Sequence, residues 1–168
     1  GLVELTTVTG FYALRGQGCI GVVVDGFGDP LVPYGFKCSQ DPSNRNASGV
    51  VNFGSRSTDC EIMGVEVFSG RFAGIMFKTD DAGTPRSAFT QKNTRLHHNY
   101  IHDVDGEAHY IGHFTWGVDN GVASGYLAPE LWDTKIFRNK VVTCGNDGIQ
   151  LGCGRYGSEI HDNDIQDA

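Results

Sequence analysis

The chain lacks an excess of basic residues and any long apolar run. Its 168 residues include 13 Lys and Arg against 20 Asp and Glu, which gives a net charge of −7. A general nucleic-acid-binding protein normally presents a basic face, so this balance argues against that class. No apolar stretch approaches the ~20 residues that a membrane-spanning helix needs. We therefore expect neither nucleic acid nor membrane among the partners.

Short motifs of metal and cofactor sites are also missing. The five cysteines, at positions 19, 38, 60, 144 and 153, form no C-x-x-C pair, which excludes zinc-ribbon and thioredoxin-like sites. No phosphate-binding loop, dinucleotide fingerprint or G-x-S-x-G motif is present. We interpret the cysteines as small buried apolar residues. The alternative is a disulfide between Cys19 and Cys38 or between Cys144 and Cys153.

Glycine, by contrast, is abundant. The 24 glycines are about twice the usual ~7% share. They follow no G-X-Y period, which excludes a collagen-like chain. Glycine spread through aliphatic and aromatic stretches indicates many tight turns between short strands. The length suits one domain with a sizeable core.

An internal repeat organises most of the chain. Segments 60–68, 94–102, 134–142 and 158–166 align without gaps, with an aliphatic residue at the third position and another five residues later. Three of the four carry Asn between these two aliphatic residues. Two further apolar positions, two residues apart, follow in the first three segments. The four columns are Ile62, Leu96, Ile136 and Ile160; Val65, Asn99, Asn139 and Asn163; Val67, Ile101, Val141 and Ile165; and the pairs Ile75 with Phe77, His109 with Ile111, and Ile149 with Leu151.

The spacing of this repeat predicts short parallel strands. A separation of two residues is the strand period, so paired aliphatic residues point to one side. The repeats start 34, 40 and 24 residues apart, and 24 residues are too few for a βαβ crossover. The Asn falls where the chain must turn. Asn tolerates the left-handed conformation, and its amide can bond the equivalent Asn of the next repeat, so we expect an Asn ladder.

The chain resembles the right-handed parallel β-helix repeat family, which includes pectate-lyase-like proteins. The resemblance rests on the pattern I-x-x-N-x-I and on G-x-D-G-I-x-L-G at 145–152. It implies an all-β solenoid over residues 50–168, with residues 1–49 as irregular N-terminal coils or a cap. An antiparallel β-sandwich is the alternative fold. Because the last repeat stops at Ala168 before its second strand, we expect a piece of a larger β-helix, or a homo-oligomer that covers the open coil.

Two expected loops mark a binding groove. Relative to the 24-residue coil, the first two coils carry 10 and 16 extra residues, which fall in loops at 79–92 and 113–132. Stacked loops on one face are the expected wall of a groove. The residues that we expect to bind substrate lie in or beside these loops: Lys78, Trp116, Tyr126, Trp132, Gln150 and Arg155. Alternatively, the aromatic residues only pack the second loop onto the coil.

Two carboxylates occupy equivalent positions of adjacent coils. Neighbouring coils lie ~4.8 Å apart, so Glu107 and Asp147 are expected to stack. Two like charges at that separation raise one pKa or recruit a cation, which predicts either an acid–base pair or a calcium site. The simpler interpretation is a pair of turn residues that accept local backbone hydrogen bonds.

Five of the six histidines lie between positions 97 and 113, but the register keeps them from converging on one metal. His109 falls in an inward column and is expected to be a hydrogen-bonded core residue. His113 follows Gly112 at the mouth of the second loop. With Tyr110 and Glu107, it is the better candidate for acid–base chemistry.

The resemblance implies an exported protein, secreted or at the cell surface, that processes a polysaccharide or glycan as a lyase, epimerase or glycoside hydrolase. In a lyase, His113 or Tyr110 is the base, and Lys78 or Arg155 pairs with the substrate carboxylate. In a hydrolase, Glu107 and Asp147 are the acid and the base. The alternative function is a non-catalytic carbohydrate-binding or structural β-helix module, such as part of an adhesin or a tailspike-like fibre.

Overall fold

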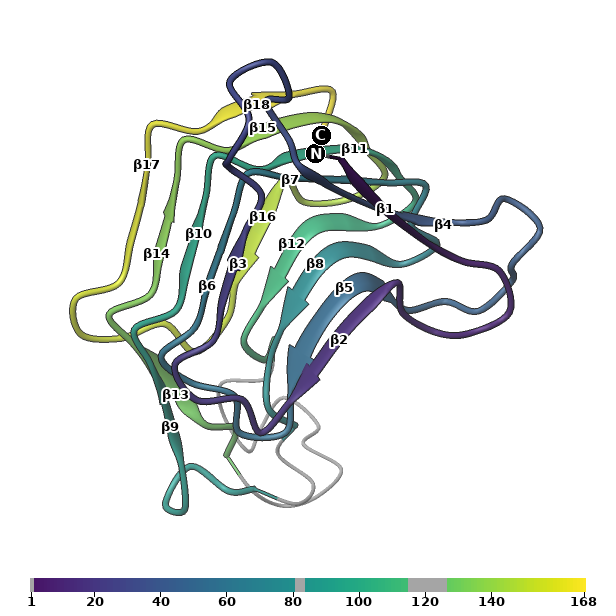
Figure 1. Cartoon of the computed structure of the whole chain (residues 1–168). Helices are drawn as coiled ribbons and strands as arrows, with labels where there is room; N and C mark the ends of the chain where they lie inside the picture. Colours follow the sequence, from purple (N-terminus) through teal and green to yellow (C-terminus); the bar gives the residue numbers. More distant parts are fainter. Residues whose placement is uncertain (1, 81–83, 115–126) are drawn as a thin grey trace.

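The chain folds into short parallel strands. A computed structural model describes residues 2–80, 84–114 and 127–168, and these contain strands, turns and irregular segments but no helix. In the same ranges no helix is long and apolar enough to cross a bilayer. Figure 1 shows three sheets whose strands lie side by side, with the chain passing from one sheet to the next. All pairings between named strands are parallel, so the sandwich alternative is wrong.

Each pass of the chain contributes one strand to each of three sheets. The first sheet, in spatial order, contains β1 (Val3–Thr7), β4 (Phe36–Gln40), β7 (Val65–Phe68), β11 (Tyr100–Val104), β15 (Lys140–Cys144) and β18 (Asp164–Gln166). The second contains β3 (Val23–Asp25), β6 (Glu61–Met63), β10 (Arg95–His97), β14 (Lys135–Phe137) and β17 (Glu159–His161). The third contains β2 (Leu14–Gln17), β5 (Gly49–Gly54), β8 (Ala73–Phe77), β12 (Glu107–Ile111) and β16 (Ile149–Leu151).

The pairing register confirms the repeat columns. Leu96 pairs with Ile62 on one side and Ile136 on the other, and Ile136 pairs in turn with Ile160. The other two aliphatic columns align in the same way in the first and third sheets. These columns point inward and form one continuous core, in which Ile62, Leu96 and Ile136 are fully buried.

The Asn ladder is also confirmed. Asn99 donates its side-chain amide to the Asn139 side-chain oxygen (3.1 Å), and Asn139 donates to that of Asn163 (3.0 Å). The expected backbone conformation is displaced by one residue, however. The left-handed φ belongs to the residue before each Asn, at His98, Arg138 and Asp162. The chain turns there, which leaves the following Asn free to point its amide inward along the stack.

The first 49 residues add strands to the same sheets. β1 extends the first sheet beyond β4, β3 extends the second beyond β6, and β2 extends the third beyond β5. β5 begins at Gly49 and runs across the expected domain boundary. The connection between β3 and β4, residues 26–35, is longer than its later equivalents, since only Gly64 separates β6 from β7.

The two expected loops contain a small sheet of their own. β9 (Thr90–Lys92) and β13 (Glu130–Trp132) pair in parallel at the end of each connection, within segments that the sequence predicted to be loop. A strand of three residues is too short to show an alternation of apolar and polar residues, so the sequence did not reveal β9 and β13. Trp116 and Tyr126 lie outside the described residues, so their predicted role stays a prediction.

The cysteines form no disulfide, so the disulfide alternatives are wrong. Four of them are buried, which confirms the interpretation as small buried residues for these four, whereas Cys19 is half-buried. Burial raises the pKa of Cys38 to about 12, which keeps this thiol protonated and unreactive.

Candidate functional site

The outer face of the third sheet holds most of the predicted catalytic residues. Ile75, Ile111 and Val51 point into the main core, and the residues between them point outward. The outward column runs through Arg15, Asn52, Met76, Tyr110 and Gln150, in strand register. Met76 and Tyr110 pack with Ala73 in a small cluster separate from the main core.

Lys78 and Tyr110 lie together on this face, as the lyase interpretation requires. The Lys78 ammonium lies 5.1 Å from the centre of the Tyr110 ring, within the range of a cation–π interaction. The same ammonium pairs with Asp80 at 3.0 Å. The Phe72 ring packs against the Tyr110 ring at a tilt of 54°, with 5.5 Å between centres. The phenol is therefore held between apolar groups and a cation, and its residue is only 5% exposed.

Glu107 shares this outer surface. It pairs with Ala73, which packs against Met76 and Tyr110 rather than in the main core. The carboxylate is buried, with 8% of the residue exposed, and its Oε2 atom has no hydrogen-bond partner. A buried oxygen of this kind normally has a partner. The unmet acceptor can take a hydrogen bond from a ligand or bind a cation.

Asp147 differs from Glu107 in its surroundings. The Ala108 N–H donates to the Asp147 backbone carbonyl at 3.0 Å, which fixes the two passes next to each other. Asp147 itself is exposed, whereas Glu107 is buried. The two residues therefore occupy equivalent positions, but they are not a symmetric carboxylate pair.

A calcium ion fits these two residues only in part. The Glu107 Oε2 atom supplies one unmet acceptor, but calcium normally takes six to eight oxygen ligands. The nearby Gln150 also buries an amide nitrogen without a partner, and that nitrogen is a donor that cannot bind a cation. Among the residues that the structure describes, no group of three or more His, Cys, Asp and Glu side chains can hold a metal.

The two histidines near β12 have different surroundings. His109 is fully buried in line with Ile75 and Ile149, and its ring nitrogen Nδ1 lies 3.1 Å from the Gly148 carbonyl oxygen. The prediction of a hydrogen-bonded core histidine is confirmed. Burial lowers its pKa to about 4, so the ring is neutral at neutral pH. His113 is half-buried beyond the end of β12, with its ring stacked on Phe114 at 5.1 Å.

Trp132 and Arg155 lie together at a different place, beside the small β9–β13 sheet. Glu130 joins them, because the Trp132 indole N–H donates to its Oε2 atom (2.9 Å) and the Arg155 guanidinium lies 3.5 Å from its Oε1 atom. Glu130 was not among the predicted residues, and neither was Tyr156, whose ring meets Trp132 edge to face at 5.3 Å. The pairing of β13 with the segment after Cys153 brings these residues into contact, and the repeat pattern carries no sign of that pairing.

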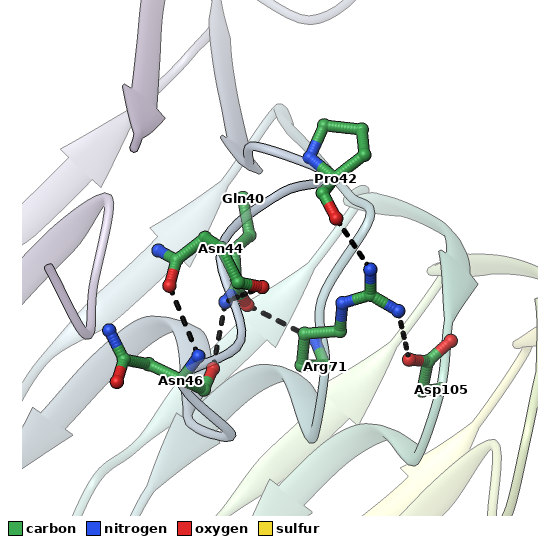
Figure 2. Close-up of polar contacts among 6 residues, drawn as sticks. All are labelled: Gln40, Pro42, Asn44, Asn46, Arg71 and Asp105. Atoms are coloured by element: carbon green, nitrogen blue, oxygen red, sulfur yellow. Dashed lines mark hydrogen bonds and ion pairs between the residues drawn. The ribbon is translucent and has the colours of Figure 1, made fainter. Parts of the chain in front are cut away.

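A polar network that the sequence did not predict supports the turn before Glu107. Figure 2 shows the Arg71 guanidinium between the Pro42 carbonyl (2.6 Å) and the Asp105 carboxylate (3.1 Å). The buried Gln40 accepts from the Arg71 N–H and donates to the carbonyls of Asn44 and Asn46. These contacts fasten the connection after β4 to the turn that starts β12. We assign the network a structural role, because its members satisfy one another.

Comparisons with protein-family models, with curated protein sequences and with solved structures gave no match.

Proposed function

We propose that the chain forms part of a right-handed parallel β-helix. The support is the order of the three sheets, each of which takes one parallel strand from successive passes, together with the Asn99–Asn139–Asn163 ladder. On this basis, we propose an exported protein that cleaves an acidic polysaccharide by β-elimination on the outer face of the third sheet. Its partners are that polysaccharide and either further coils of a larger chain or a second copy.

One observation carries the choice of reaction. The Lys78 ammonium lies over the Tyr110 ring at 5.1 Å, beside a buried Glu107 carboxylate with one unpartnered oxygen. β-Elimination from a uronate sugar needs a cation that neutralises the sugar carboxylate and a base that removes the adjacent proton. Lys78 and Tyr110 supply these two groups within contact distance, and Arg155 belongs to the separate Glu130 cluster.

The proposed reaction proceeds as follows. The substrate carboxylate displaces Asp80 from Lys78. The Lys78 ammonium then stabilises the negative charge that develops on the sugar carboxylate. The Tyr110 hydroxyl oxygen takes the proton from C5 and passes its own proton to the departing O4 oxygen. The electron pair of the C5–H bond forms the C4–C5 double bond as the C4–O bond breaks. Glu107 accepts a hydrogen bond from a sugar hydroxyl and so orients the ring.

Hydrolysis by Glu107 and Asp147 has less support. Such a reaction needs both carboxyl groups to flank one glycosidic bond. Glu107 is buried and Asp147 is exposed, so the two carboxylates do not present themselves equally to one substrate.

The test is cleavage of polygalacturonate, alginate and a neutral glucan, followed by the ultraviolet absorbance of the unsaturated product and by reducing ends. We expect absorbance from an acidic substrate, with a loss of at least tenfold in Lys78→Gln and in Tyr110→Phe. Lys140→Gln is the matched control, because Lys140 makes a similar contact with Tyr100 in another sheet, at 5.3 Å. If His113→Ala loses cleavage activity while Tyr110→Phe keeps full activity, His113 is the base instead.

Calcium is the cofactor that this experiment also tests, at Glu107 and Asp147. A bound calcium ion would help to neutralise the substrate carboxylate. An arm with chelator followed by added calcium decides its role, because activity that disappears and returns requires the ion. Reducing ends without absorbance move the assignment to hydrolysis by Glu107 and Asp147.

The alternative function is glycan binding without cleavage. The burial of Tyr110 favours it, since a base that is 5% exposed has limited access to substrate. In that case, polygalacturonate binds with no product of either kind, and Lys78→Gln weakens binding.

A further inference from the structure

Three consecutive passes meet at the corner beside β13. Lys92 on β9 pairs directly with Trp132 on β13. On the other side of β13, residues 154–157 continue the parallel pairing, with a bridge between Leu131 and Gly154 and a hydrogen bond from the Asp133 N–H to the Tyr156 carbonyl. The side chains of Lys92, Trp132 and Tyr156 lie next to one another across three passes, because Lys92 and Tyr156 both contact the Trp132 ring.

The two aromatic rings of this group are held in place. The Trp132 indole N–H donates to Glu130, and the Tyr156 ring meets the Trp132 ring at 88° with 5.3 Å between centres. Tyr156 is nevertheless 63% exposed, although a large aromatic residue usually contributes to a core. An exposed ring in a fixed orientation is a ready surface for the apolar face of a sugar.

Cations surround these rings. The Lys92 ammonium lies 5.2 Å from the Trp132 ring, and the Arg155 guanidinium lies 5.2 Å from the Tyr156 ring. Arg86 approaches Glu130 at 3.9 Å. Lys92 and Arg155 thus place two cations against the rings, and Arg86 and Arg155 both approach Glu130. The carboxylate of an anionic ligand that reaches the rings would meet the charges of Lys92 and Arg155.

We propose that Lys92, Trp132, Arg155 and Tyr156 form an accessory subsite for one carboxylated sugar of an acidic glycan. The sugar stacks on the exposed face of Tyr156, and its carboxylate lies between Lys92 and Arg155. Glu130 has a positioning role, because it fixes both Trp132 and Arg155. The glycan class rests on the proposed function. The subsite lies in a different sheet from Tyr110 and binds without taking part in cleavage.

The test measures binding of galacturonate oligomers to the full chain by calorimetry. We expect Tyr156→Ala to weaken binding about tenfold and Lys92→Gln about fivefold. Lys140→Gln, whose ammonium lies 5.3 Å from the Tyr100 ring, is the matched control and leaves affinity unchanged. Because Tyr156 and Lys92 are both exposed, neither substitution opens a core cavity, and unchanged melting curves verify the fold.

Each outcome separates this inference from the proposed cleavage. Weaker binding in both variants, with unchanged turnover of a short substrate, supports the subsite. The same loss in a chain that cleaves nothing supports the subsite and removes the proposed reaction. Unchanged affinity in both variants overturns the subsite, whether or not the chain is active. Equal affinity for a neutral glucan, or preference for a sulfated glucan, overturns its assignment to a carboxylated sugar.

Discussion

The side-chain oxygen of Asn139 accepts two hydrogen bonds from Asn99, one from its backbone N–H and one from its side-chain amide, both at 3.1 Å. The Asn139 amide in turn donates to the Leu96 carbonyl (2.9 Å) and to the Asn163 side-chain oxygen (3.0 Å). Asn139 is 1% exposed. One side chain therefore satisfies polar groups of three consecutive passes in a place that water does not reach.

Replacing this side chain should be costly. Asn139→Ala leaves the N–H and amide of Asn99 without their shared acceptor, and each buried unsatisfied group costs ~1–3 kcal/mol. We expect the free energy of unfolding to fall by roughly 2–4 kcal/mol, as measured by urea denaturation. Asn163→Ala is the matched control, because Asn163 is only partly buried and should lose less. Equal losses in the two variants would show that burial of the ladder carries no extra energy.

His109 should make stability depend on pH. Its folded pKa is about 4 because of burial, below the ordinary value of 6.5 in the unfolded chain. As pH falls from 6.5 to 4, the unfolded state takes up a proton that the folded state refuses, so the stability present above pH 6.5 is lost. The loss is on the order of 3 kcal/mol at ~1.4 kcal/mol per pKa unit. Denaturation midpoints at pH 7 and pH 4 measure it.

His109→Ile is the control for that prediction. The Nε2 atom of His109 is buried without a partner, and Ile75 and Ile149 occupy the same column on both sides. The Gly148 carbonyl keeps the hydrogen bond from the backbone N–H of residue 109 (3.2 Å). We expect this variant to be at least as stable at pH 7 and to lose less stability on acidification. An unchanged pH profile would assign the acid sensitivity to other groups.

Two glycines with nearly the same φ should respond differently to alanine. Gly112, with φ 72°, would place a new Cβ against the Gly152 carbonyl, whereas Gly21, with φ 70°, has open space there. Gly21→Ala should therefore cost ~1 kcal/mol from backbone strain alone. Gly112→Ala should cost several times more, because two passes must separate. Thermal melting of both variants compares the cost of backbone strain alone with the cost of strain plus the steric clash. Equal shifts in melting temperature would contradict the close approach at Gly112.

Glu107→Gln should separate stability from function. The substitution removes a buried charge with an unpartnered oxygen, which costs free energy in the folded state. We expect the free energy of unfolding to stay level or to rise by ~1 kcal/mol, while cleavage or binding of the acidic glycan falls at least tenfold. Asp147→Asn, at an exposed position, is the control. A clear loss of stability in Glu107→Gln would make Glu107 a structural residue.

The sequence was sufficient for the strand register and the inward columns. A period of two and a recurring Asn are local properties, and the pairing of Leu96 with Ile62 and Ile136 follows from them. The inward placement of His109 followed from the same register. The residue that turns, such as His98 before Asn99, was not predictable from side-chain type, because no feature of His favours φ 53° over its neighbour.

The candidate site was predictable only in part, because its contacts cross between passes. Register alone put Tyr110 and Glu107 on one outer face, and the burial of Tyr110 came from neighbours such as Phe72 and Lys78. Trp132 and Arg155 were expected to bind substrate in the same groove as Tyr110. They belong instead to the β9–β13 corner, where three-residue strands are too short to show a period.

The connections at that corner differ in length, yet the sheets on either side keep one register. Residues 78–94, 112–134 and 152–158 join the third sheet to the second in successive passes, and the strands that they join pair residue for residue. Lengthening one connection therefore leaves the scaffold undisturbed. The length and sequence of each connection can therefore change independently during evolution. Ligand recognition at this corner can diversify without any compensating change in the core.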